Sequence, residues 1–544
     1  MLTALLLLPL LAGCGDKDSS GDGPAVSQQD DTGTDGDTDG GTDGGTDGGP
    51  GATDDTACEP QTFYADADSD GYGDPDAPTE ACEQPDDTVS NDRDCDDTDP
   101  ETWPGADELC DSPSVAVDND CDGSVDEGLS VDWWWPDQDG DGSGDPVGGI
   151  EACAEPTSGD YAWVDNDRDC DDADDISPRF VDASVIGGDG GPDSPFPTLQ
   201  EAADAGASCI NVAPGSYEPV TLERGVVSIS ADGDASDTVI DARGEGACLV
   251  VTGDARVTLE GFTLQGGYGH EVEYSCSTYD LCLYHYGGGV YSDSTGGVTL
   301  RGVDIQEMIL PFSSSSVGGT SIYRYGQGGA VAALGGEVAL EDVSIRDTFA
   351  VYGAAMYLID TRASLTRVRI EGADGYIGGV YISNGELTAS AVIANGNEVG
   401  YGVIYLLSGS ATLDHLSFAD NTTPASYTSA DVRADEATTV TLTNSVLAYN
   451  DTYGLHDPNG RVELSWSNLY GAGRSDIYNG EVPTRDGMIS QDPAFSGLRI
   501  DGEGGDDLTL SAGSPCIDAG DPAASTDADG SAADMGAYGG PDGY

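Results

Sequence analysis

Three short segments of the sequence place carboxylates at a spacing suited to a hard cation. Each segment has aspartates at positions 1, 3, 5 and 9 and a glycine at position 6. The aspartates are Asp66, Asp68, Asp70 and Asp74; Asp118, Asp120, Asp122 and Asp126; and Asp137, Asp139, Asp141 and Asp145. In the calcium loop of an EF-hand these positions supply oxygen ligands at about 2.3–2.6 Å, and the glycine permits the sharp turn. The spacing therefore predicts calcium as a cofactor.

The three loops also depart from the EF-hand pattern. None has glutamate at position 12, where Ala77, Leu129 and Gly148 stand, and no long amphipathic helices flank them. The loops contain no histidine, which disfavours copper and zinc relative to an oxygen-seeking cation. The alternative interpretation is that aspartate and glycine serve only as turn formers.

Residues 58–178 contain an internal duplication. The pattern at 66–74 returns at 137–145, and the pattern at 91–97 returns at 166–172. The loops resemble the turns of thrombospondin type 3 repeats, and the whole Cys/Asp-rich pattern resembles the MopE-type repeats of secreted bacterial proteins, a family described as metal-binding. The resemblance implies metal binding by this region. It is poor in aliphatic residues, so we expect metal and disulfides to hold it together.

The first residues predict the compartment. Residues 1–11 form an apolar run that is too short to span a bilayer, and residues 1–13, which precede Cys14, are expected to form a signal peptide. The segment 11–14 resembles the bacterial lipobox, which implies a lipoprotein signal peptide and lipidation of Cys14. Gly15 in place of Asp favours the outer membrane by resemblance to lipoprotein sorting rules, and we expect surface exposure. No Lys or Arg precedes the apolar run, and a lipobox that failed would leave a soluble secreted protein.

Residues 14–57 are rich in Asp, Gly and Thr and are expected to form a disordered linker.

Charge and cysteine content narrow the classes of partner. The chain has 18 basic and 102 acidic residues, a net charge of −84. This charge excludes electrostatic binding to nucleic acid or to anionic lipid and favours cations as partners. Solubility or adaptation to a salty medium would also explain the acidic composition.

The cysteine content predicts how the chain is cross-linked. Besides Cys14 there are seven cysteines in 58–170 and five in 209–516. Complete pairing would need at least one disulfide between these two parts; otherwise each keeps a free thiol. We expect a monomer.

A short repeat dominates the second half of the chain. A pair of small residues, then an apolar residue and usually a tyrosine, recurs from Gly288, Gly328, Ala354, Gly378 and Gly402, with starts 40, 26, 24 and 24 residues apart. Alternating segments such as 298–300 and 338–340 lie between these copies. Two short strands per period predict a solenoid. Residues 193–202 predict a turn, an N-cap and a short helix that ends near Gly206.

The residues that follow this helix carry a second resemblance. The short helix and the run from Val212 to Tyr217 that follows it resemble the entry to the right-handed parallel β-helix of pectate-lyase-like proteins. The resemblance covers residues 179–490 and implies an all-β solenoid. Residues 491–544 resemble the choice-of-anchor C-terminal cap that follows such β-helices.

Two coils of the solenoid are longer than the rest. They span 266–287 and 308–327, and insertions in neighbouring coils emerge on the same side of a solenoid. Tyrosines and charges on projecting loops suit a polysaccharide ligand. The candidate ligand-binding residues are Tyr268, His270, Tyr279, Tyr286, Tyr323, Arg324 and Tyr325. Cys276 and Cys282 are close enough to close a small loop, and the alternative is a disulfide-closed lid in which the tyrosines serve as packing.

No clear catalytic motif is present. Polysaccharide lyases on this fold need a base, and hydrolases need paired carboxylates. The candidates are Arg367 and Arg369 on one strand and Glu341 in the preceding coil, although exposed strands also carry such charges for solubility. We therefore predict a calcium-binding, non-catalytic surface lipoprotein whose β-helix binds glycans or other surface ligands. The alternatives are a polysaccharide lyase or glycoside hydrolase, and a structural envelope protein.

Overall fold

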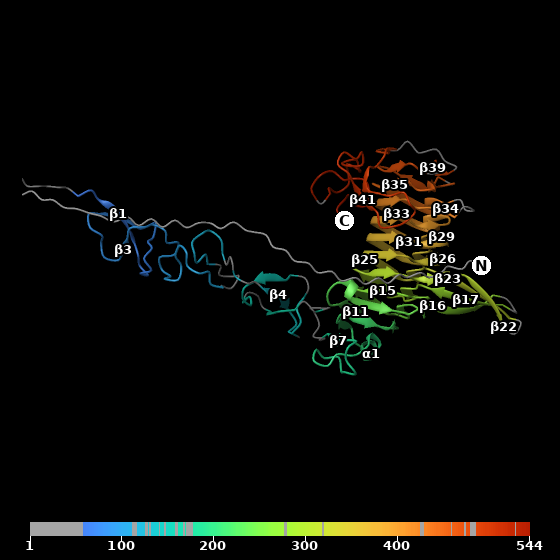
Figure 1. Cartoon of the computed structure of the whole chain (residues 1–544), viewed down its shortest axis with the longest axis horizontal. Helices are drawn as coiled ribbons and strands as arrows, with labels where there is room; N and C mark the ends of the chain where they lie inside the picture. Colours follow the sequence, from blue (N-terminus) through green and yellow to red (C-terminus); the bar gives the residue numbers. More distant parts are fainter. Residues whose placement is uncertain are drawn as a thin grey trace, which may run out of the picture.

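The fold is built almost entirely from β-strands. The computed structural model describes residues 58–110, 117–125, 129, 132–140, 142–145, 148–157, 161–166, 169, 178–276, 280–317, 320–424, 429–458, 460–472, 475–478, 486–527 and 529–544. The described strands form a 25-stranded sheet, an 8-stranded sheet and three small sheets. Figure 1 shows the large sheet wound into a stack of coils, with the strands of 58–164 lying outside it. No described helix has the length and apolarity needed to cross a membrane.

The 25-stranded sheet is a parallel β-helix with three faces. The first face contains β8 (Cys209–Val212), β11 (Val226–Ala231), β14 (Arg256–Glu260), β19 (Gly297–Arg301) and β37 (Val462–Leu464). The second contains β9 (Gly215–Tyr217), β12 (Thr238–Asp241), β15 (Thr263–Gln265), β20 (Asp304–Gln306), β35 (Val446–Ala448) and β38 (Asn468–Tyr470). The third contains β10 (Val220–Leu222), β13 (Leu249–Val251), β18 (Val290–Ser292), β24 (Val331–Leu334), β27 (Met356–Ile359), β30 (Val380–Ser383), β36 (Tyr453–His456) and β39 (Ser475–Tyr478).

Five long strands turn the corners between these faces. They are β25 (Glu337–Arg346), β28 (Arg362–Glu371), β31 (Gly385–Asn395), β33 (Gly402–Ala419) and β34 (Ala430–Thr443). β25, β28 and β31 each join the first face to the second, because their two halves pair with successive halves of the next strand. β33 also contributes to the third face through its pairing with β30.

Equivalent positions of successive coils stack in register. Val257 lies beside Val298, and Val298 beside Val338. The tyrosine repeat stacks in the same way on the third face, where Met356 pairs with Val380 and Tyr357 with Tyr381. Because side chains alternate along a strand, the apolar member points into the coil and the tyrosine points out. The predicted solenoid and all-β fold are therefore confirmed.

The N-terminal end of the β-helix is covered by a short helix and a strand. α1 (Leu199–Asp204) begins after Thr198, whose Oγ1 accepts the Glu201 N–H at 3.2 Å. Leu199 and Ala202 are buried against the first coils, and β7 (Arg179–Val181) pairs with β8. The predicted N-cap and short helix are confirmed.

The two long coils build part of a second sheet at the side of the β-helix. This side sheet runs β16 (His270–Ser275), β17 (Asp280–Tyr286), β23 (Thr320–Gln327), β26 (Phe349–Tyr352), β29 (Asp374–Ile377) and β32 (Glu398–Val399), with β21 (Ile309–Leu310) on β26 and β22 (Ser313–Val317) on β23. We call β16, β17, β22 and β23 the flap; Figure 1 shows them projecting from the coils. The two insertions thus lie side by side, as predicted, because β17 and β23 pair in parallel.

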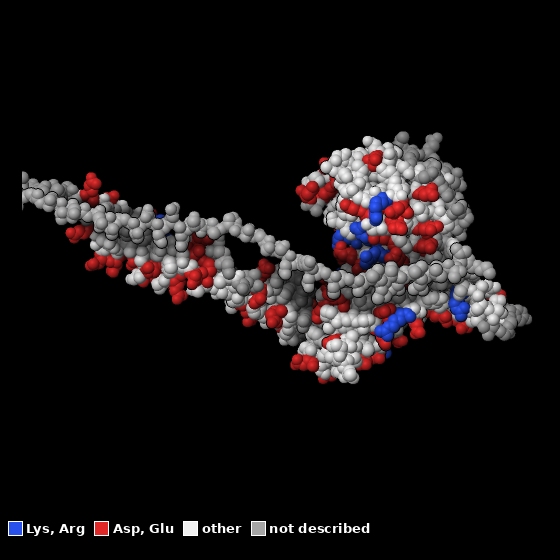
Figure 2. Space-filling model, in the orientation of Figure 1, with Lys and Arg blue, Asp and Glu red and all other residues white. Residues whose placement is uncertain are grey.

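Residues 58–178, the acidic region, contain two small three-stranded sheets. The first consists of β1 (Gln61–Ala65), β2 (Pro78–Ala81) and β3 (Thr88–Val89), and the second of β4 (Asp132–Asp137), β5 (Ile150–Ala152) and β6 (Ala162–Val164). Few large apolar side chains are buried here, among them Phe63 and Trp163. Figure 2 shows acidic side chains spread over the visible face of this region.

The C-terminal segment lies along the side of the coils. It contains the hairpin β40 (Phe495–Gly497) and β41 (Asp507–Leu510). Leu508 and Ala537 pack against Ile393 and Ala419 of the second face. Figure 1 shows this segment, in red, beside β31 and β33. The segment therefore covers the outer surface of the second face.

Disulfides are concentrated in the acidic region. Cys58–Cys82, Cys95–Cys121 and Cys110–Cys153 lie within it, and Cys276–Cys282 closes the predicted small loop of the flap. Cys209 is also disulfide-bonded. Cys248 and Cys516 are buried free thiols. Pairing is therefore incomplete, and both free thiols belong to the β-helix and its C-terminal segment.

Candidate metal centre and ligand surface

The first aspartate loop meets a second acidic segment. Carboxylate oxygens of Asp66, Asp68 and Asp70 lie within 4.8 Å of one another, and Asp68 forms an equally tight group with Asp94 and Asp97. Asp74 is not a member of either group; its carboxylate accepts the Asp76 N–H at 2.7 Å. The structure thus brings together three of the four predicted aspartates and adds two from the segment that precedes β4.

Local hydrogen bonds shape the loop and dock it on that segment. Gly71 has a φ of +98°, which lets the chain turn sharply between β1 and β2. Asn91 Nδ2 donates to the Gly71 carbonyl at 2.9 Å, and the Asp94 N–H donates to the Gly73 carbonyl at 3.2 Å. A Cβ on Gly73 would lie 2.7 Å from Tyr64 and 2.8 Å from the Asn91 carbonyl, so only glycine permits this approach.

Several carboxylate oxygens of this site lack hydrogen-bond partners. One oxygen each of Asp66, Asp68, Asp70 and Asp94 is buried without a hydrogen bond. Asp94 is only 3% exposed, and burial raises its pKa to about 6, with a further upward contribution from Asp70 and Asp68. Burial also raises the pKa of Asp68. Among the described residues no basic side chain forms an ion pair with these carboxylates, so at neutral pH their charges are uncompensated.

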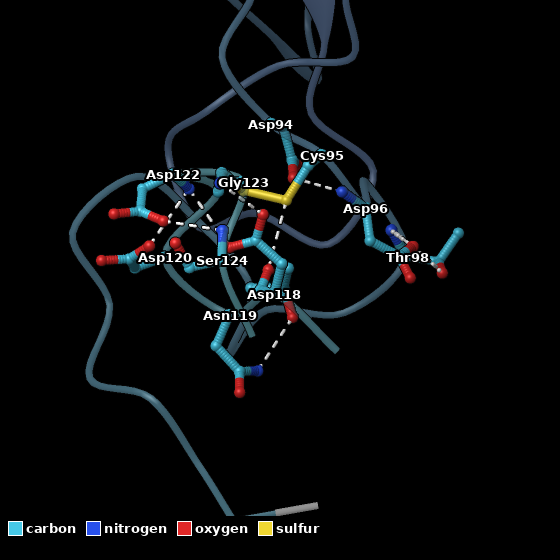
Figure 3. Close-up of a disulfide and its surroundings, with 12 residues drawn as sticks. Asp94, Cys95, Asp96, Thr98, Asp118, Asn119, Asp120, Asp122, Gly123 and Ser124 are labelled. Atoms are coloured by element: carbon cyan, nitrogen blue, oxygen red, sulfur yellow. Dashed lines mark hydrogen bonds between the residues drawn. A yellow bond between two sulfur atoms is a disulfide. The ribbon is translucent and has the colours of Figure 1, made fainter. Parts of the chain in front are cut away.

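The second aspartate loop forms a separate cluster. Oxygens of Glu108, Asp118 and Asp120 lie within 4.8 Å of one another. Figure 3 shows Asp118 turned toward the backbone of the loop, where it accepts the N–H groups of Asp122 and Gly123 at 3.1 and 2.9 Å. The Asp122 carboxylate accepts the Ser124 N–H at 2.9 Å, and Asp126 lies outside the described residues. Glu108 was missed by the sequence prediction because it precedes the loop by ten residues.

A disulfide connects the two clusters. Cys95 follows Asp94 directly and is bonded to Cys121, in the loop that carries Asp118 and Asp120. The Cys95 Sγ also lies 3.5 Å from the Asp118 carbonyl oxygen (Figure 3). The disulfide therefore fixes the backbone of both clusters relative to each other.

The third aspartate loop is described only in part, because Asp141 lies outside the described residues. The Asp137 carboxylate accepts the N–H groups of Gly140 and Gly142 at 2.7 and 3.1 Å. Asp139 and Asp145 are described, and neither belongs to a cluster of three acidic ligands in the described part of the chain. The duplicated framework is nevertheless present, since Asn166 Nδ2 donates to the Gly142 carbonyl at 3.2 Å, as Asn91 does to Gly71.

Several of the predicted ligand-binding side chains are packed against the β-helix instead of facing solvent. Tyr286 is 6% exposed, His270 stacks on the buried Tyr291 at 4.4 Å, and Tyr268 meets His285 edge-on at 5.0 Å. Burial raises the pKa of Tyr286 above its usual range. Tyr286 and His270 pack the flap onto the third face, and Tyr268 packs against the flap, as the lid interpretation expected. Tyr279 lies outside the described residues.

The outer part of the flap carries a row of aromatic rings. Tyr284 stacks on Tyr325 at 5.3 Å, Tyr274 meets Tyr284 at 5.4 Å, and Phe312 meets Tyr325 at 5.2 Å. Tyr274 and Phe312 are each 49% exposed, and Tyr284 and Tyr325 are half-buried. Register places Tyr323 and Tyr325 on one side of β23 and Arg324 on the other, where Arg324 donates to Ser315 at 3.2 Å. We call Tyr274, Tyr284, Tyr325 and Phe312 the aromatic row; the sequence prediction included only Tyr325.

Two of the three catalytic candidates, Arg367 and Glu341, are in contact, whereas Arg369 has a separate partner. Arg367 donates to both oxygens of Asp342 and to Glu341 at 3.1 Å, and its hydrogen bonds to Asp342 raise its pKa still further above neutral. Glu341 also pairs with Arg301 at 3.4 Å. Arg369 instead donates to Glu371 at 3.2 Å and lies beneath the Tyr544 ring. Each guanidinium is thus held by carboxylates or covered, and neither is arranged as a base.

Comparison with known proteins finds one sequence motif and several distant structural similarities. A family model described as "Putative metal-binding motif", of MopE type, matches residues 94–127, which include Asp94, Glu108, Asp118 and Asp120. No curated protein matches the chain in sequence. Among solved structures, pectate lyase Pel9A is 13% identical, with 67% of this chain and 97% of that chain covered and a TM-score of 0.32. Pectin methylesterase from Aspergillus niger is 14% identical, with 58% and 90% covered and a TM-score of 0.25. Pectin methylesterase PemA from Erwinia chrysanthemi is 12% identical, with 57% and 92% covered and a TM-score of 0.22. These similarities concern the fold alone.

Proposed function

We propose that this chain is a surface-exposed outer-membrane lipoprotein that binds calcium through its acidic region and binds glycans, without cleaving them, through its β-helix. The observation that carries the glycan part is the aromatic row. Its four rings follow one another at 5.2–5.4 Å along a projecting sheet, and two of them are half exposed. Rings with an open face suit the apolar faces of sugar rings, and the tyrosine hydroxyls supply hydrogen bonds.

The calcium part rests on the carboxylate clusters and the matched motif. Among the described residues the clusters offer carboxylate oxygens and no nitrogen or sulfur ligand, which favours a hard cation. A region with so few buried apolar side chains also gains more from a cation that binds only the folded form.

A glycan panel tests the aromatic row. The full chain is screened against neutral and acidic polysaccharides, and binding is followed by calorimetry. Tyr284→Ala and Tyr325→Ala are each expected to weaken binding about tenfold, which corresponds to the loss of about 1.4 kcal/mol of stacking and contact. Tyr376→Ala is the matched control, because Tyr376 is a 45% exposed tyrosine of β29 that lies outside the row. Unchanged affinity in both row variants would contradict the glycan site.

The same panel separates binding from catalysis. Reaction mixtures are followed for new unsaturated or reducing ends, and we expect none because Arg367 and Arg369 are occupied by Asp342 and Glu371. Turnover that is abolished by Arg367→Ala or Glu341→Gln would establish the lyase or hydrolase alternative. Neither binding nor turnover with any polysaccharide would favour a structural envelope protein.

Attachment to the membrane is tested at Cys14, which lies outside the described residues. Cys14→Ser is expected to move the chain from the membrane fraction to the soluble fraction, because a lipid anchor needs the thiol. Wild-type chain in the soluble fraction would contradict the lipoprotein assignment.

A further inference from the structure

We infer that a single composite site for a hard divalent cation joins the first aspartate loop to the segment before Cys95, with Asp94 and Asp97 as ligands beside Asp66, Asp68 and Asp70. This inference rests on the proposed calcium binding and names the ligands of one site. The sequence spacing alone assigns this loop a self-contained set of ligands that ends at Asp74. The structure replaces Asp74 with two residues from a different segment.

Asp68 is the residue that makes the site composite. It belongs to both groups of carboxylate oxygens, one with Asp66 and Asp70 and the other with Asp94 and Asp97, and each group lies within 4.8 Å. Oxygens that coordinate one calcium ion at about 2.4 Å lie at most about 4.8 Å apart, on opposite sides of the ion. Within each group the oxygens therefore have the separation expected of ligands around one cation, and Asp68 is common to both groups.

The buried, unpartnered oxygen of Asp94 is an independent sign of a missing ligand. Asp94 is 3% exposed; one of its oxygens accepts the Asp96 N–H at 2.9 Å, and the other is buried without a hydrogen bond. One oxygen each of Asp66, Asp68 and Asp70 is likewise buried without a hydrogen bond. A buried charged oxygen without a partner is costly, and several beside one another are more so. A divalent cation satisfies all of these oxygens together.

Hydrogen bonds hold the loop and the segment together around this position. The Ala67 N–H donates to Asp97 Oδ1 at 2.8 Å, so Asp97 is fixed against the loop itself. The bonds from Asn91 to Gly71 and from Asp94 to Gly73 hold the segment at Asn91 and at Asp94 itself. The ligands therefore come from two segments that are positioned by backbone contacts independent of the cation.

Terbium(III), which prefers oxygen ligands and emits when it is excited through a nearby aromatic ring, provides a probe of this site. The Tyr72 N–H donates to Asp70 at 2.7 Å, and the Tyr72 ring stacks on Trp103 at 5.6 Å, so an excitable pair adjoins the ligands. The full chain is freed of metal with a chelator and titrated with terbium, and calcium is then used as a competitor. We expect sensitised emission that calcium displaces.

Asp94→Asn and Asp97→Asn test the composite ligand set. Each is expected to weaken terbium and calcium binding at this site at least tenfold. In Asp97→Asn the amide oxygen of the new side chain can still accept the Ala67 N–H, so that variant removes charge while keeping the contact. Asp86→Asn removes an exposed carboxylate between β2 and β3 and is expected to leave affinity unchanged. Native disulfide pairing of each variant, checked by mass spectrometry, separates a lost ligand from a failure to fold.

The outcomes separate this inference from the proposed function. If the wild-type chain binds calcium and both Asp94→Asn and Asp97→Asn bind it with unchanged affinity, the composite site is wrong and calcium binding stands. If the wild-type chain binds neither calcium nor terbium, the proposed function and the composite site fail together.

Discussion

Asn397 donates a hydrogen bond from Nδ2 to Asn421 Oδ1 at 2.8 Å inside the β-helix, where both side chains are almost fully buried. Asn421 repeats the contact one coil further on, donating from Nδ2 to Asn450 Oδ1 at 3.0 Å. The three asparagines thus form a ladder that runs parallel to the stack of coils. Each side chain also donates to a backbone carbonyl, which for Asn421 is that of Ala394.

Asn421→Ala is expected to lower the free energy of unfolding by about 3 kcal/mol, because it removes the acceptor of two buried N–H groups of Asn397 and a donor to the Ala394 carbonyl. Chemical denaturation followed by circular dichroism measures the change. A loss below about 1 kcal/mol would mean that water or local relaxation replaces the missing bonds.

The buried Asp431 is expected to make stability depend on pH. Burial raises its pKa well above 3.8, and Thr452 and Asn450 donate to its two oxygens at 2.8 Å each. The folded chain therefore keeps this proton where the unfolded chain has lost it. The contribution of protonated Asp431 to the free energy of unfolding is fully present below about pH 4. It is lost as the pH rises through the pKa of Asp431 in the folded state.

Asp431→Asn removes this dependence. The amide oxygen can accept from Asn450, and the amide nitrogen can donate to the Thr452 hydroxyl. Between about pH 4 and about pH 8, we expect the unfolding free energy of the variant to rise relative to that of the wild type. Denaturation in the presence of a chelator measures this difference without a contribution from bound metal. A difference that stays constant with pH would contradict the assignment of a neutral Asp431.

The second acidic cluster is expected to hold a cation of its own. Asp120→Asn removes one carboxylate of the cluster. In the wild-type chain the Asp122 N–H donates to Asp120 Oδ1 at 3.1 Å, and the amide oxygen of the variant can still accept this bond. Calcium calorimetry on this variant should show the loss of one binding event, whereas Asp86→Asn should match the wild type. An unchanged number of bound ions in Asp120→Asn would remove Glu108, Asp118 and Asp120 from the set of ligands.

The Cys276–Cys282 disulfide is expected to stabilise the outer end of the flap. It closes a loop across β16 and β17, and closing so short a loop contributes about 2 kcal/mol against local opening. Replacing both cysteines by serine should speed hydrogen exchange in residues 270–286 and weaken glycan binding at the adjacent aromatic row. Exchange in β28 and β31 serves as the internal control and should not change. Equal exchange rates in 270–286 would show that the strand pairing alone holds the hairpin.

The solenoid could be predicted from the sequence alone. Small and apolar residues recur at equivalent positions such as Val298 and Val338, and parallel stacking places these positions side by side whatever happens elsewhere. The helix after Thr198 was predictable for the same reason, since an N-cap is a local signal. The convergence of Asp66, Asp68 and Asp70 likewise follows from their spacing around a tight turn.

Only the tertiary structure decided which distant residues meet. Asp94 and Asp97 reach Asp68 because hydrogen bonds dock one segment on another, and Glu108 reaches Asp118 across a loop. The flap strands bury Tyr286 and leave Tyr274 exposed, although the two tyrosines come from the same hairpin. Arg367 turns to Asp342 and Arg369 to Glu371, because Arg367, with a φ of +51°, lies at the corner between two faces, whereas Arg369 lies on the second face. Residue type and spacing specify what a side chain can bind, whereas its partners depend on the direction of each strand and on contacts between segments far apart in the chain.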